Sequence, residues 1–214
     1  MMNIWKYGKK MQNFMQKGNA FWRIRIMYDM VCLPVRKKEF KEFSKKEAEI
    51  YLKWYISEID SRIFILKRFA KEDGCKCNFD YSPESLIDLW SWFETKIYTE
   101  EKSTKELEEE YKKYPEWMHE FISSTKISIE TYKIAWDVSV YFGEVLVRNN
   151  SELYYGFFSK PKSSMSVNKP VVLGFKHNID VDPRQIIKVL SLRDLKESNA
   201  RALYETYLNW VEDI

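Results

Sequence analysis

The stretch Tyr141-Phe-Gly-Glu-Val-Leu-Val-Arg-Asn-Asn150 decides the fold, because a long apolar segment ends here and the pattern changes. Residues 127–148 are apolar on nearly every side, which is typical of a central, buried helix. Residues 153–159 and 170–176 are short runs rich in aromatic and β-branched side chains, which favour strands. The sequence therefore predicts an α+β fold, with one mainly helical domain over residues 1–214 and a small antiparallel sheet near residues 152–176.

Helix start signals place the other elements. Ser44-Lys-Lys-Glu47 has the spacing of a capping box, and apolar residues then recur every three or four positions as far as Asp73-Gly74. Ser82-Pro83 predicts a second helix start, and residues 100–113 predict an exposed, charged helix or loop. Two closing helices are expected over residues 184–195 and 199–211, with Asp182 and Ser198 as their N-caps.

Composition indicates a packed protein with few turns. Hydrophobic residues make up 45% of the 214 residues, whereas glycine and proline contribute six each. No run approaches the roughly 20 apolar residues of a membrane span, and no secretion signal is evident. The odd set Cys32, Cys75 and Cys77 suits reduced thiols better than a disulfide framework, so we expect a cytoplasmic location.

Positive charge is concentrated near the N-terminus. Residues 1–46 contain twelve Lys or Arg residues against three acidic residues. We expect the basic segment 1–43 to pack on the body, with a helix over residues 3–17 and either a strand or a helix over residues 21–35. Binding of nucleic acid by this segment is the alternative, which the overall pI of about 8.5 disfavours.

The first candidate site lies on the central helix. Asp137, Tyr141 and Glu144 follow the spacing i, i+4, i+7, so they share one face and could serve there as acid, base or ligand. The favoured interpretation is structural: the two carboxylates form ion pairs with basic residues of the N-terminal segment.

The second candidate is the loop between the two expected strands. Lys160, Lys162, Asn168 and Lys169 could bind a phosphate or an acidic protein, since loops held by rigid strands often carry recognition. A solvated hairpin connection is the simpler interpretation. The loop lacks the pattern of a nucleotide-binding P-loop.

Metal, cofactor and catalytic patterns are weak. Cys75-Lys-Cys77 does not have zinc-site spacing, His119 and His177 lie far apart, and both cysteines are expected in an exposed turn after Gly74. Dinucleotide, lipase and metalloprotease motifs are missing. We therefore expect no metal and no cofactor.

Residues 127–195 resemble small, uncharacterised bacterial α+β proteins, some of which are immunity-like. The resemblance is carried by Tyr141-Phe-Gly-Glu-Val-Leu-Val-Arg148, the Tyr154-Tyr155 strand, Pro170-Val-Val-Leu-Gly-Phe175 and Val181-Asp-Pro183. It implies an α+β fold and supplies no catalytic residue set.

These observations favour a non-enzymatic, cytoplasmic interaction protein that binds a partner protein, in the manner of an immunity-type inhibitor. The abundant Trp and Tyr residues are of the kind that anchor interfaces. The alternatives are an enzyme of unrecognised type that uses Asp137 and Glu144, and a protein that binds nucleic acid through its basic N-terminus. The sequence indicates no oligomeric state.

Overall fold

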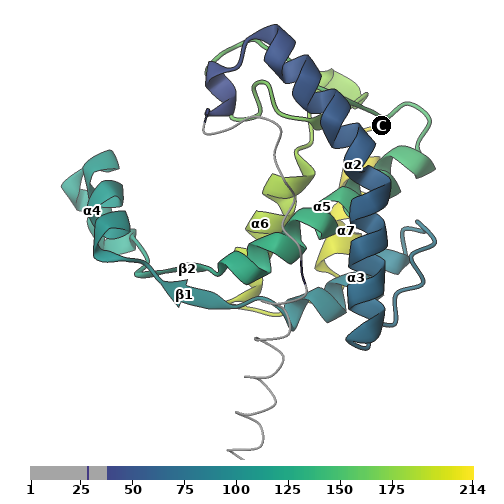
Figure 1. Cartoon of the computed structure of the whole chain (residues 1–214), viewed down its shortest axis with the longest axis horizontal. Coiled ribbons are helices and arrows are strands. Elements are labelled where there is room, and N and C mark those ends of the chain that lie inside the picture. The colour runs from purple at the N-terminus through teal and green to yellow at the C-terminus, as the bar shows by residue number, and fades with distance from the viewer. Residues whose placement is uncertain (1–27, 29–37) are drawn as a thin grey trace, which may run out of the picture. The chain divides into compact units, whose positions relative to one another are not determined.

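The helix α5, Ile129–Asn149, is the central element of the fold (Figure 1). Helices α2, α3 and α6 all pack against it, and most of its side chains are buried. This confirms the central, buried helix predicted from its apolar surface. The computed structural model describes Tyr28 and residues 38–214, and those from Lys38 onward belong to one compact unit, Val31–Ile214.

The helix α2, Lys45–Glu72, has the limits that its sequence predicts. Ser44 and Glu47 form the capping box, which satisfies free backbone donors of the first turn. Asp73 closes the helix, and Gly74 follows with φ of +88°, a left-handed conformation that suits glycine at a helix end. A short 3-10 turn, η1 (Phe40–Glu42), precedes α2, and Phe40 and Phe43 both pack against the ring of Tyr51.

Three further helices complete the body. They are α3 (Ser85–Glu94), α6 (Pro183–Asp194) and α7 (Ala202–Val211). Asp182 caps α6 as predicted, because its side chain accepts from the backbone N–H of Arg184. The prediction for Ser198 is wrong: α7 begins four residues later, and the Ser198 hydroxyl donates to Glu94 Oε1 instead.

The predicted sheet is present as an antiparallel pair, β3 (Tyr154–Gly156) and β4 (Val171–Leu173). Val172 also pairs with Val181, which brings the start of α6 beside the sheet. Gly174, directly after β4, has φ of +111°, and a Cβ there would lie 2.1 Å from the carbonyl oxygen of Glu152. A short 3-10 turn, η3 (Lys176–Asn178), follows. The chain is therefore α+β, as predicted.

A second antiparallel pair, β1 (Thr99–Glu101) and β2 (Thr125–Ile127), was not predicted. The segment between these strands forms α4 (Thr104–Lys113) and the 3-10 helix η2 (Glu116–Phe121). We refer to residues 99–127 as the arm. Figure 1 shows α4 at the far end of the arm, away from α2, α5 and α7.

No helix in the described part of the chain is long and apolar enough to cross a membrane. The expected helix over residues 3–17 lies outside the described residues. The same holds for residues 21–35, Tyr28 excepted, and for most of the basic segment 1–43.

Candidate functional site

Asp137 is fully buried and forms a two-pronged ion pair with Arg62 of α2. Arg62 Nε donates to Asp137 Oδ1 at 2.8 Å, and a terminal nitrogen of Arg62 donates to Oδ2 at 2.7 Å. The structural interpretation of Asp137 is therefore supported, although this partner comes from α2 and not from residues 1–46. Both oxygens of this carboxylate are therefore engaged by one guanidinium.

Tyr141 and Glu144 also have structural partners. The Tyr141 hydroxyl accepts from the backbone N–H of Tyr81 at 3.0 Å and lies 2.8 Å from Ser85 Oγ. Glu144 accepts from Arg148 Nε at 2.7 Å, one turn further along α5. The three residues predicted to share a face thus make three separate contacts, and none of them lines a described cavity.

The 160–169 loop is attached to η1 more firmly than a solvated connection would be. Asn168 is buried, and its amide donates to the carbonyls of Phe40 and Phe43. Lys162 donates to the carbonyls of Lys41 and Phe43, while Lys160 is exposed. Lys169 points the other way, with its ammonium 3.7 Å from Asp182 Oδ2.

The cysteines do not form a metal site with other described residues. In that part of the chain, no group of three or more His, Cys, Asp or Glu side chains could hold a metal ion. Cys77 is buried, contrary to the expected exposed turn, and burial raises its pKa to about 12. Cys32 lies outside the described residues.

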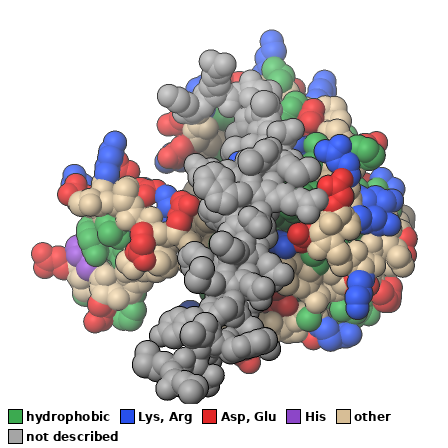
Figure 2. Space-filling model, turned by 60° about the horizontal axis from the view of Figure 1, so that its bottom comes forward, with side chains coloured by type: hydrophobic (Ala, Val, Ile, Leu, Met, Phe, Trp, Pro, Cys, Tyr) green, Lys and Arg blue, Asp and Glu red, His purple; other side chains and the backbone are tan. Residues whose placement is uncertain are grey.

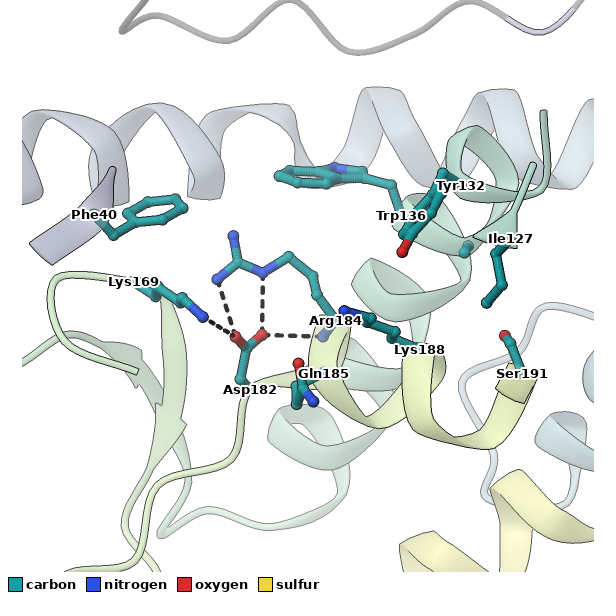
Figure 3. A pocket seen from close by; sticks show the side chains of 11 residues that line it. Phe40, Ile127, Tyr132, Trp136, Lys169, Asp182, Arg184, Gln185, Lys188 and Ser191 are labelled. Carbon is teal, nitrogen blue, oxygen red and sulfur yellow. Dashed lines mark hydrogen bonds and ion pairs between the residues drawn. The ribbon is translucent and has the colours of Figure 1, made fainter. Parts of the chain in front are cut away.

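A cavity of about 290 Å³ lies between α5 and α6 (Figure 3), and we call it the α5/α6 cavity. Trp136, Ala135, Ile127 and Phe40 make its walls mostly apolar. Its polar lining side chains are Tyr132, Lys169, Asp182, Arg184, Gln185, Lys188 and Ser191. Four of these seven, Arg184, Gln185, Lys188 and Ser191, come from α6, where residues three and four positions apart share one face.

Arg184 and Asp182 form one end of this cavity. Arg184 Nε donates to Asp182 Oδ1 at 3.0 Å, and a terminal nitrogen donates to the Pro170 carbonyl at 3.2 Å. The guanidinium lies 5.5 Å from the Phe40 ring centre and 5.4 Å from that of Trp136. Burial alone would lower the pKa of Arg184, but the neighbouring Asp182 carboxylate raises it.

Tyr51 and Tyr155 have buried hydroxyls that make no geometric hydrogen bond within the described residues, although Tyr51 lies near Arg184 and Tyr155 near Glu144. Burial raises the pKa of Tyr51 to about 12, and the nearby Arg184 guanidinium partly offsets the rise. Burial also raises the pKa of Tyr155 well above its usual value. Neither tyrosine can therefore ionise near neutral pH.

The arm carries exposed aromatic side chains. Trp117 and Phe121 on η2 are 71% and 73% exposed, and Tyr111 and Tyr114 are also exposed. We call these four residues the arm tip. Figure 2 shows hydrophobic side chains gathered on the arm, at the left of the view, beside a histidine. The ring of His119 packs 4.7 Å from that of Tyr111, and its Nε2–H faces the carbonyls of Tyr111 and Tyr114 at 3.0 Å each, so the tip is ordered by its own contacts.

Ion pairs tie the arm together below its tip. Lys126 of β2 pairs with Glu100 of β1 and with Glu106 of α4, and Lys102 pairs with Glu110. The Lys126 ammonium and the Ser103 cap lower the pKa of Glu106 to about 2. A second cavity of about 510 Å³ runs from Tyr114, Met118 and Phe121 of the arm to Lys188 and Leu192 of α6. It shares Ile127, Tyr132 and Lys188 with the α5/α6 cavity.

Two polar groups of the α5/α6 cavity already have partners. The one carboxylate of the α5/α6 cavity, Asp182, is engaged with Arg184 and Lys169, and the hydroxyl of Ser191 donates to the carbonyl of Ile187. No histidine or cysteine lines either cavity. In the α5/α6 cavity, the hydroxyl of Ser191 is therefore not paired with a base.

Comparison with family models, with curated proteins and with solved structures finds no match for this chain. The resemblance to immunity-like proteins therefore stays a prediction.

The arm tip, Trp136, Arg184 and Lys188 were not singled out from the sequence. Pro115-Glu-Trp-Met-His-Glu-Phe121 does contain a signal, because Trp117 and Phe121 interrupt a strongly charged segment. Large apolar residues in such a segment are either buried or available to a partner.

Proposed function

We propose that this chain is a non-enzymatic protein-binding protein whose arm tip docks into a partner protein. The observation that carries the proposal is the exposure of Trp117 and Phe121 on one short helix of the arm. Aromatic side chains, Trp and Tyr above all, contribute much of the binding energy at protein interfaces when they enter a pocket of the partner.

The charges around the arm tip indicate what kind of surface the partner has. Residues 99–127 contain eight acidic residues and five lysines, so the arm is acidic overall. Lys102, Lys105 and Lys126 are paired within the arm, whereas no ion pair involves Glu116 or Glu120, which flank Trp117 and Phe121, in the part of the chain that the structure describes. The complementary surface is an apolar hollow flanked by basic side chains.

The packing of the arm supports this role. Its internal ion pairs and the capping box formed by Ser103 and Glu106 order α4 before any partner arrives. A preformed surface loses little conformational entropy when it binds. An inhibitor of the immunity type, acting in the cytoplasm, is the form of such a protein that we propose.

Site-specific photo-crosslinking tests the proposal. A photoreactive phenylalanine analogue replaces Tyr114, which precedes Trp117 by three residues, so Trp117 and Phe121 stay intact. The matched control carries the analogue at Phe64, which is 64% exposed on α2. We expect one protein to be crosslinked from position 114 in the native cell and not from position 64. Equal crosslinking from both positions, or none from position 114, would overturn the proposal.

A further inference from the structure

We propose that the α5/α6 cavity is a binding site for an apolar group that carries a carboxylate at one end. This inference goes beyond the arm tip and does not depend on it. Figure 3 shows two ends of the cavity: Phe40, Lys169 and Asp182 lie on one side, and Ile127, Tyr132 and Lys188 lie on the other.

Charge in the cavity is unbalanced. Asp182 is its one acidic residue, and it is shared by Arg184 at 3.0 Å and Lys169 at 3.7 Å. Lys188 forms no ion pair with any residue of the described chain. Positive charge beside mostly apolar walls favours a ligand that brings a negative charge with it.

Three polar groups on the lining have no protein partner. Within residues 38–214 the side chains of Tyr132, Gln185 and Lys188 make no hydrogen bond, although all three can donate one. Tyr132 is 41% exposed and Lys188 is also exposed, so water reaches both groups and a ligand would take its place. Gln185 and Lys188 are three residues apart on α6 and so lie on one face, across from Tyr132 of α5. Side-chain donors from both helices thus line the cavity, and we expect a bound carboxylate to accept from them.

The apolar part of the ligand fits the remaining walls. Ile127, Ala135 and Trp136 surround a space of about 290 Å³, near the lower end of the range for small-molecule pockets. A phosphate dianion fits less well, because one unpaired ammonium faces it and Asp182 would repel it. A single carboxylate is the better match.

Two sources could present this chemistry: a free small carboxylic acid, or an acidic side chain next to an apolar one on a peptide. NMR titration of the full-length protein distinguishes them. The probes are 3-phenylpropionate, its neutral amide, and the peptide acetyl-Phe-Glu-amide. The readout is the backbone amide signals of Ala135, Gln185 and Ser191, which line the cavity.

We expect 3-phenylpropionate or the acidic peptide to shift these signals saturably, and the neutral amide to bind at least about tenfold more weakly. The tighter of the two acidic probes identifies the source. Lys188→Glu and Tyr132→Phe should each weaken binding. The matched control Lys67→Glu changes an exposed lysine of α2 by the same charge and should leave binding unchanged.

The proposal would be overturned if neither acidic probe shifted these signals, or if the neutral amide bound as tightly as the acid. Equal binding by Lys188→Glu and by the wild-type protein would also overturn it. The proteins in this titration keep an intact arm tip, so the result is separate from the crosslinking result.

Discussion

The hydroxyl of Tyr155 lies directly over the backbone of Gly143. A Cβ built on Gly143 would lie 2.5 Å from Tyr155 Oη and 3.3 Å from Cζ. Gly143 is in the middle of α5, where glycine costs about 1 kcal/mol relative to alanine. The close approach of strand β3 to α5 explains why this helix has a glycine at its centre.

Gly143→Ala should therefore destabilise the protein, by roughly 1–3 kcal/mol, because the tyrosine ring is rigid and must move. Urea unfolding followed by circular dichroism measures the change. An alanine variant more stable than the wild-type protein would show that helix propensity outweighs the contact.

Tyr155→Phe provides the matched rescue. It removes the atom that the new methyl group would meet, so Gly143→Ala should cost little in the Tyr155→Phe background. By itself, Tyr155→Phe should leave the free energy of unfolding unchanged or raise it by about 1 kcal/mol, since the buried hydroxyl makes no geometric hydrogen bond within the described residues. Equal costs of Gly143→Ala in both backgrounds would contradict this account.

The ion pair between Arg62 and Asp137 predicts a large effect on stability. Asp137→Ala leaves a buried guanidinium without this carboxylate and should lower the free energy of unfolding by about 3–5 kcal/mol. Glu144→Ala is the control, because its partner Arg148 is half-exposed and the loss should stay near 1 kcal/mol. A fully stable Asp137→Ala protein would reopen a functional role for this residue.

The raised pKa of Asp194 predicts that the stability of the protein depends on pH. Burial, and next its neighbour Glu94, raise the pKa of Asp194 from 3.8 to about 7. Between these values the folded protein holds a proton that the unfolded chain releases. Stability should therefore fall as the pH rises from about 4 to 7, and the loss should be complete above about 7.

Asp194→Asn removes this titration and can keep the hydrogen bond from Trp90 Nε1. The variant should match the wild-type protein near pH 4 and exceed it by about 1 kcal/mol at pH 8, a value discounted because much of the group lies in water. Glu94→Gln should flatten the pH profile only in part, because burial, the larger cause of the raised pKa of Asp194, remains. The prediction would be contradicted if the wild-type protein, Asp194→Asn and Glu94→Gln all lost the same stability as the pH rises from about 4 to 8.

Local signals in the sequence predicted most of the helices and the β3–β4 pair. The capping box at Ser44 and the cap at Asp182 act within one turn, so the sequence shows them directly. The misplaced cap at Ser198 shows where this fails, because its hydroxyl is taken by Glu94, more than a hundred residues away. A sequence pattern that spans one helical turn cannot show a hydrogen bond to so distant a residue.

The unpredicted strands have a similar explanation. Thr99-Glu-Glu101 has little strand propensity of its own, and it pairs because the arm brings Thr125–Ile127 beside it. The sequence does contain a signal for the partner of Asp137. Arg62 falls on the buried stripe of α2, between Ile59 and Leu66. A charged residue on such a stripe indicates a buried partner elsewhere.

The most direct test of protein binding through the arm is calorimetric. The partner crosslinked from position 114 is purified and titrated against the wild-type protein, Trp117→Ala/Phe121→Ala and Phe64→Ala. We expect the double variant to lose at least about a hundredfold in affinity, which corresponds to roughly 2.7 kcal/mol, and Phe64→Ala to bind like the wild-type protein. Equal affinity of the double variant and the wild-type protein would contradict the central claim.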